Sequence, residues 1–97
     1  MKAVAVHQVP SLTQERYEEV VRRLTNGKRR LESPSDLPVD GLLVHVAVQT
    51  ENGFMVLDVF ESEEASDRFS EATRPTAQAV GIEEPPGIYP AHTFVLY

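Results

Sequence analysis

Residues 41–65 read GLLVHVAVQTENGFMVLDVFESEEA, and this stretch decides the fold. Two apolar runs flank Asn52-Gly53, a dipeptide typical of tight β-hairpins because both residues tolerate the positive φ of a type I′ turn. Ser62 follows the second run and can cap a helix whose first turn is acidic. The stretch therefore predicts a strand, a two-residue turn, a second strand and the start of a helix.

A two-residue turn at Asn52-Gly53 fixes the cross-strand register, so that Ala47 faces Asp58 and His45 faces Phe60. Cross-strand partners share a face of the sheet. One predicted face is mixed, and it carries Leu43, His45, Ala47, Gln49, Phe54, Val56, Asp58 and Phe60. The other predicted face is wholly apolar, and it carries Val44, Val46, Val48, Met55, Leu57 and Val59. A sheet with one wet face would alternate apolar and charged residues, so both faces are expected to need cover.

The segments before the hairpin predict one strand and one helix. Residues 2–9, KAVAVHQV, form a strand that ends at Pro10, which has no backbone donor. Thr13 can cap the following helix, and Asn26-Gly27 can end it. The inner face of this helix is an apolar stripe of Tyr17, Val20, Val21 and Leu24. Residues 28–40 form a long loop, for which a lid over a pocket and a tolerated insertion both stay open.

The segments after the hairpin predict a second helix and a last strand. The inner face of this helix is expected to carry Ala65, Phe69, Ala72 and Thr76. Pro75 is expected to interrupt the helix, because proline removes a hydrogen bond and clashes with the preceding turn. Residues 88–97, IYPAHTFVLY, form the last strand, and Pro90 suggests an edge or a bulge at its start.

The predicted order is β-α-β-β-α-β, the ferredoxin-like arrangement of an α+β fold, as a single domain over residues 1–97. It implies a four-stranded antiparallel sheet with strand order 4-1-3-2 and both helices on one face. The helix-free face would then still need burial. Burying one valine-sized side chain contributes about 1.5–3 kcal/mol, so exposing six is costly. A second copy related by two-fold symmetry would cover them, which predicts a homodimer.

Composition restricts the partners. The net charge of −6 argues against binding a phosphate backbone, and Lys28-Arg29-Arg30 is interpreted as a solvated loop. The chain has no cysteine, the apolar run at its start is too short for a signal peptide, and no run approaches the roughly 20 apolar residues of a membrane span. We therefore expect a cytoplasmic protein that binds neither nucleic acid nor membrane.

The run VLDVFESEEASDRF, residues 56–69, resembles the strand-to-helix region of the dimeric α/β-barrel superfamily, in its antibiotic-biosynthesis-monooxygenase-like branch. The shared pattern is an apolar strand, an aromatic residue that is usually tryptophan, Glu-Ser, and a helix with an inner alanine and aromatic. GLLVHV is similar to a bacterial, actinobacterial-type group. The resemblance implies two sheets joined back to back into a barrel, with a pocket between each sheet and its helices, lined by Phe60.

The chain departs from the heme-degrading members of that superfamily. Their site uses an asparagine on the first strand, the tryptophan and a histidine on the second helix. The matching places here hold His7 and Phe60, and the second helix has no histidine. That heme site is therefore not carried over, and no cofactor is predicted.

The candidate catalytic residues are His45 and Asp58, predicted to lie diagonally on adjacent strands of the mixed face. A carboxylate beside an imidazole fixes its tautomer and suits a general base, although a purely structural bond is the alternative. His7 is the second choice of partner for Asp58. The predicted ligand-binding residues are His7, Tyr17, Phe60, Phe69 and His92. Histidines scattered over several strands are a weak metal pattern, so no metal site is predicted.

The sequence has no glycine-rich phosphate loop, no setting for a serine or cysteine nucleophile and no aromatic-basic surface. Hydrolysis, kinase chemistry and RNA binding are therefore disfavoured. Two classes stay open. One is a cofactor-independent monooxygenase, isomerase or cyclase that acts on a small apolar, aromatic or polyketide-like compound. The other is a non-catalytic dimeric ligand-binding or stress-associated module.

Overall fold

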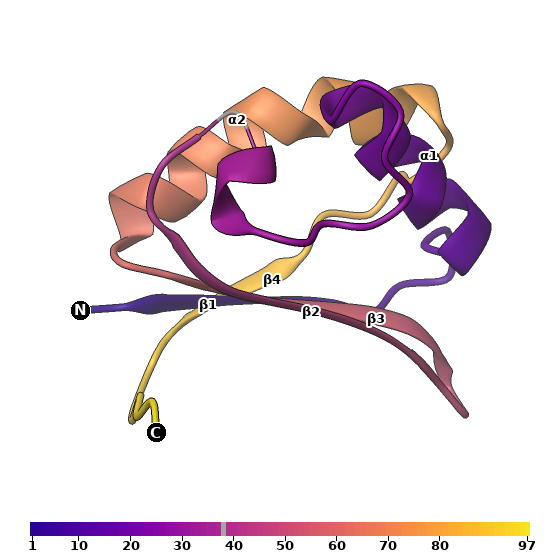
Figure 1. Cartoon of the computed structure of the whole chain (residues 1–97). Coiled ribbons are helices and arrows are strands. Elements are labelled where there is room, and N and C mark those ends of the chain that lie inside the picture. Colours follow the sequence, from indigo (N-terminus) through magenta and orange to yellow (C-terminus); the bar gives the residue numbers. More distant parts are fainter. Residues whose placement is uncertain (38) are drawn as a thin grey trace.

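The computed structural model describes residues 1–37 and 39–97, and it is an α+β fold. Its elements in chain order are β1 (Ala3–His7), α1 (Gln14–Leu24), the short 3₁₀ turn η1 (Pro34–Asp36), β2 (Leu42–Thr50), β3 (Gly53–Phe60), α2 (Glu63–Ala79) and β4 (Gly87–Pro90). The strands form one antiparallel sheet in the order β2-β3-β1-β4. Both helices lie on one face of it (Figure 1). The predicted element order and strand order are confirmed, and the arrangement is compatible with a ferredoxin-like fold.

The helices begin where their capping residues predict. The side chain of Thr13 accepts a hydrogen bond from the backbone N–H of Arg16 at 3.2 Å, and that of Ser62 accepts one from Ala65 at 3.1 Å. Each bond satisfies one of the free N–H groups in a first helical turn. After α1 the chain reverses through Asn26 and Gly27, which have φ of 59° and 107°.

The hairpin register differs from the predicted one by two residues. His45 lies directly opposite Asp58, whereas the sequence predicted that it faces Phe60. Side chains alternate with a period of two along a strand, so a shift of two residues keeps each side chain on its predicted face. The consequence is therefore confined to the pairing. Asp58 is the direct cross-strand neighbour of His45 and not its diagonal one.

The turn causes this shift. The pair closest to the turn is Thr50 and Gly53, so the two central residues are Glu51 and Asn52. Gly53 has φ of 122°, while Asn52 has no positive φ, so the predicted type I′ turn at Asn52-Gly53 is wrong. A turn followed by a glycine with positive φ is the other common hairpin form. The Thr50 hydroxyl stabilises it by donating to the carbonyl of Gly53 at 2.7 Å.

A β-bulge separates Leu42 from Val44 at the start of β2. Because of it, Leu42 pairs with Phe60 and is buried on the helix side of the sheet. Leu43, which was predicted on that face, is 37% exposed instead. A bulge adds one unpaired residue to a strand, which is why strict alternation fails there.

Two further predictions for the C-terminal half are wrong. The helix α2 continues through Pro75 to Ala79, because packing of Phe69 and Ala77 on its inner side holds the segments before and after the proline. Pro75 itself is exposed, so water can replace the hydrogen bond that it removes. Ala72, predicted on the inner face, is exposed.

The last strand is shorter than predicted. It ends at Pro90, and residues 91–97 leave the sheet. The backbone N–H of Ala91 still donates to the carbonyl of Lys2 at 2.8 Å, which ties the start of this tail to the start of the chain. Proline has no N–H for the ladder, so pairing on this edge strand stops there.

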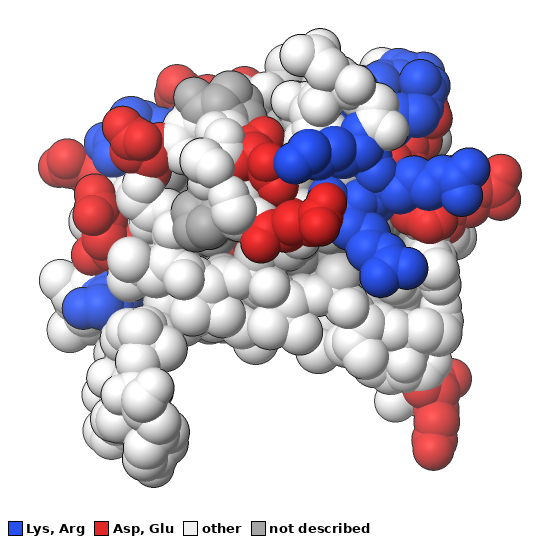
Figure 2. Space-filling model, viewed as in Figure 1, with Lys and Arg blue, Asp and Glu red and all other residues white. Residues whose placement is uncertain are grey.

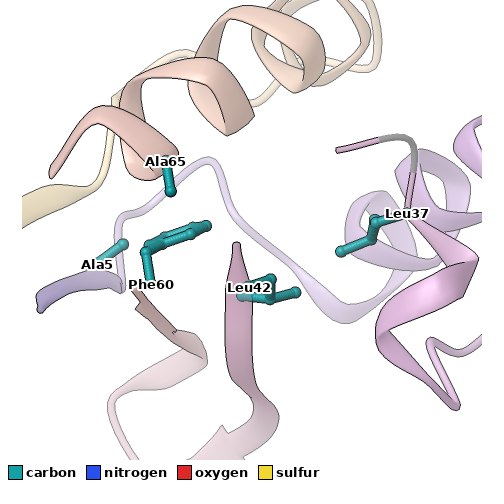
Figure 3. Close-up of a cluster of buried hydrophobic side chains, with 5 residues drawn as sticks. All are labelled: Ala5, Leu37, Leu42, Phe60 and Ala65. Atoms are coloured by element: carbon teal, nitrogen blue, oxygen red, sulfur yellow. The ribbon is translucent and has the colours of Figure 1, made fainter. Parts of the chain in front are cut away.

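The core lies between the sheet and the helices. Figure 3 shows Phe60 between Ala5 and Leu42 of the neighbouring strands and below Ala65 of α2, with Leu37 turned toward Leu42. A second cluster lies beside it and contains Leu12, Phe54, Val56 and Ile82. The mixed face of the hairpin is therefore the one that the helices cover.

The opposite side of the sheet has no helix over it (Figure 1). We call it the open face, and the register places on it Val4, Val6, Val44, Val46, Val48, Met55, Leu57, Val59 and Tyr89. Figure 2 shows the charged side chains gathered over the helices and loops, while the surface along the sheet is almost uncharged. In the described part of the chain, no helix is long and apolar enough to cross a membrane.

Candidate functional site

A cavity of about 210 Å³ lies between the sheet and the helices. Its floor comes from β1, β2 and β3, its roof from α1 and α2, and its rim from the segment 82–86. Most of the side chains that line it are apolar, with Phe60 and Phe69 on one side and Leu12 and Val56 on the other. An apolar cavity with a few convergent polar groups is the usual form of a small-molecule site.

Three polar side chains form a hydrogen-bonded series on the cavity wall. The hydroxyl of Tyr17, from α1, lies 2.6 Å from Nε2 of His45 on β2. Nδ1 of the same ring lies 2.5 Å from Oδ1 of Asp58, directly opposite on β3. Asp58 is only 6% exposed, and a buried carboxylate requires a hydrogen-bond partner. His45 is that partner. All three residues line the cavity.

Burial raises the pKa of Tyr17 to about 12, and the negative charges of Asp58 and Glu18 add to this effect. The phenol therefore keeps its proton at neutral pH. When the imidazole of His45 is neutral, only one order of protons fits both bonds. Tyr17 donates to Nε2, and the Nδ1–H group donates to Asp58.

Packing holds the donor of this series in place. The planes of the Tyr17 and His45 rings are nearly parallel, with 14° between them and 5.9 Å between centroids, so the two rings meet through the hydroxyl–Nε2 bond. The Tyr17 ring also packs against Phe54 at 5.2 Å. Tyr17 was predicted to close the cavity, and here it also supplies the hydroxyl group that lies nearest to the imidazole.

His7 also lines the cavity but belongs to a different set of contacts. Its Nε2 lies 2.8 Å from the backbone carbonyl of Glu84, so the ring donates there and does not reach Asp58. The Glu84 carboxylate accepts from the hydroxyl and the backbone N–H of Ser11. The Ser11 hydroxyl bond lowers the pKa of Glu84. The segment 82–86 was predicted only as a loop, and its role as a cavity rim was missed.

The structure does not bring His92 to this site. His92 lies exposed in the tail 91–97, outside the cavity lining, whereas the other predicted site residues all line the cavity. Among the described residues, no group of three or more histidines and acidic side chains is placed to hold a metal ion.

The loop 28–40 closes the β2 side of the cavity through Leu31 and Leu37. Asp36 organises it by accepting from the backbone N–H of Glu32 at 2.9 Å and from Lys28 at 2.8 Å. These bonds lower the pKa of Asp36 to about 2. Position 38 lies outside the described residues. Covering of the cavity by this loop is observed, and its opening as a lid stays a prediction.

No family model, curated protein or solved structure matches this chain. The functional assignment therefore depends on the fold and on the geometry of the cavity.

Proposed function

We propose that the protein is a homodimer of the dimeric α/β-barrel type, and that each protomer binds a small ring compound in its cavity and catalyses proton transfer on it. The observation that carries this proposal is the series Tyr17–His45–Asp58 on the wall of a mostly apolar cavity. A histidine oriented by a buried carboxylate is a recurrent general base in enzymes.

The cavity volume limits the size of the ligand. A dry protein cavity of about 150 Å³ accepts a benzene molecule. The 210 Å³ available here accepts one ring with a short substituent. A single-ring aromatic or alicyclic compound with a polar oxygen therefore fits inside the cavity.

The proposed chemistry is removal of a proton from a carbon next to a carbonyl group. The ligand oxygen takes the hydrogen bond of the Tyr17 hydroxyl, which leaves Nε2 of His45 free to accept the C–H proton. Asp58 stabilises the imidazolium that forms through its bond to Nδ1. The negative charge on the enolate oxygen is stabilised by the tyrosine O–H. In a ligand with a C=C bond next to the deprotonated carbon, return of the proton to the far carbon of that conjugated system completes an isomerisation. In a ligand that has a second carbonyl group, the enolate carbon can attack that group and close a ring while the His45 imidazolium protonates the new alkoxide, which is the cyclase variant.

A non-catalytic ligand-binding role is the second candidate. Among the described residues, every buried side-chain polar atom already has a hydrogen-bond partner. A network that is satisfied without a ligand is also what a structural His–Asp pair requires. In that case the cavity would bind the ring compound and leave its C–H bonds intact.

Exchange of substrate hydrogen for deuterium separates the two candidates without knowledge of the product. Acetophenone and phenylacetone, two single-ring ketones with acidic C–H groups, are incubated with the protein in D₂O and followed by proton NMR. We expect protein-dependent loss of the C–H signals, abolished in His45→Gln and retained in His92→Gln. Binding without exchange in the wild-type protein contradicts catalysis and favours the binding role.

The proposed dimer is tested on the open face. Val46 lies on this face and is 45% exposed, so Val46→Asp leaves the protomer core intact but places a charge in the interface. Ala47→Asp is the matched control, because Ala47 pairs with Val56 on the opposite face of the same strands and is also exposed. Sedimentation should give twice the chain mass for the wild type and the control, and the chain mass for Val46→Asp. A monomeric wild type contradicts the dimer.

A further inference from the structure

The tail 91–97 stands away from the rest of the protomer. Figure 1 shows the C-terminal end on the side of the sheet opposite the helices, and Figure 2 shows it projecting from the surface there. Val95 is 63% exposed and Leu96 is 69% exposed, and Tyr97 is fully exposed. These side chains are apolar or aromatic, and the tail sequence AHTFVLY contains no acidic residue, lysine or arginine.

Only the base of the tail is held by its own protomer. Ala91 is hydrogen-bonded to Lys2, and the Lys2 ammonium group lies 5.3 Å from the centre of the Phe94 ring. Residues beyond Phe94 extend past these contacts on the open-face side of the sheet. A short uncharged arm with exposed large side chains is costly in water unless another surface covers it.

The area of the open face shows why a second copy needs this arm. One strand residue covers roughly 16 Å² of sheet plane, given the spacing along and between strands. The four strands contain 5, 9, 8 and 4 residues, which amounts to a flat area of about 400 Å². A stable interface buries about 800 Å² on each partner. One buried tyrosine adds about 150–250 Å², so the tail supplies much of the difference.

We infer that residues 91–97 of each protomer form an arm that packs against the side of a second copy seated on the open face. This inference depends on the proposed homodimer and adds to it the segment that completes the interface. The arm has no acidic residue, lysine or arginine of its own, and the strand residues on the open face are uncharged, so a second copy can cover both surfaces, with the Lys2 ammonium group beside Phe94 at the base of the arm. The partner is therefore a second copy of this chain.

The double variant Val95→Asp/Leu96→Asp tests the inference. Both side chains are exposed in the protomer, so the change should leave its fold intact, as checked by the amide NMR spectrum at low concentration. We expect the dimer dissociation constant to rise by at least about a hundredfold. Ile88→Asp is the matched control, because Ile88 is 39% exposed on the opposite face of β4, and its dissociation constant should stay within about threefold of the wild type. If the dimer dissociation constant of the double variant is unchanged, the inference about the arm is wrong, while the proposed dimer is not contradicted.

A spin label gives a direct readout of the contact. The chain has no cysteine, so Thr93→Cys carries a label at one position only. Labelled protein without ¹⁵N is mixed with ¹⁵N-labelled wild type, which confines any broadening to contacts between copies. We expect a contiguous set of amide signals of the ¹⁵N-labelled copy to broaden. Absence of broadening at a concentration where sedimentation shows a dimer overturns the inference, and a wild type that never dimerises overturns both the arm and the dimer.

Discussion

The raised pKa of Tyr17 predicts that the protein loses stability at alkaline pH, and replacement of Tyr17 alone should remove that loss. In the folded chain this pKa is about 12, against 10.0 for an unperturbed tyrosine, mainly because the ring is buried. The folded state therefore holds the phenol proton more tightly than the unfolded state does. Its contribution to stability is fully present below pH 10 and is lost as the pH rises toward 12.

The magnitude follows from the difference between the two pKa values. Two pKa units correspond to about 2.7 kcal/mol of stability. Because the ring is only partly buried and solvent screens the nearby charges, we expect about 1–2 kcal/mol. Tyr17→Phe keeps the ring that packs on Phe54 and removes the titrating group. It should lose about 1 kcal/mol at neutral pH through the missing bond to His45.

Urea unfolding of both proteins at several pH values between 10 and 12 measures the effect. The free energy of unfolding of the wild type should fall by about 1–2 kcal/mol more than that of Tyr17→Phe over this range. The ultraviolet difference spectrum between the two proteins should show tyrosinate forming near pH 12. Parallel stability curves, or tyrosinate that forms near pH 10, would refute the assignment of Tyr17 as the buried donor to His45.

Three further changes test the fold and the buried pair by urea unfolding. Gly53→Ala should lower the free energy of unfolding by about 1 kcal/mol, because the φ of 122° is strained for alanine. No atom lies within 4 Å of the added carbon, so no clash adds to this loss. Gly41→Ala should lower the free energy of unfolding clearly more, because its positive φ is also strained and the new carbon would lie 2.6 Å from Cβ of Ala65; equal losses for the two variants would contradict this close approach of Gly41 to Ala65. Asp58→Ala should lower the free energy of unfolding by about 2–4 kcal/mol, because it leaves the Nδ1–H group of His45 buried without an acceptor. A loss below about 1 kcal/mol would show that the His45–Asp58 pair contributes little to stability.

The elements and the two faces of the hairpin follow from periodicity and capping, because those patterns are local. The strand order follows from the β-α-β-β-α-β order of the elements, and the resemblance at Phe60 implied that the helices cover the mixed face. Thr13 and Ser62 begin their helices as predicted, and the alternation along β3 places Asp58 on the covered side. The hairpin register could not be predicted, because two turn forms accept Asn-Gly and only their backbone angles distinguish them. The bulge at Leu43 could not be predicted either, because a strict period of two does not show where a strand gains an unpaired residue.

The candidate site could be predicted only in part. The contact between His45 and Asp58 was expected, and the two-residue shift makes it direct. The bond from Tyr17 depends on where α1 crosses β2, which the sequence does not define. The bond of His7 to Glu84 joins residues 77 positions apart, and neither the local pattern nor the composition of the segment 82–86 indicates it. Contacts between residues so far apart in the sequence are set by tertiary packing alone.

The most direct test of the proposed site is an NMR titration of the His45 ring nitrogens with phenol and, separately, with toluene. The two probes match in size and differ in one oxygen, and both fit a cavity of about 210 Å³. If the Tyr17–His45–Asp58 series meets the ligand oxygen, phenol should bind at least about tenfold more tightly and shift both ring nitrogens of His45. Toluene should move only the signals of apolar lining residues such as Phe60 and Phe69. Equal binding of the two probes with unmoved His45 nitrogens would contradict the account.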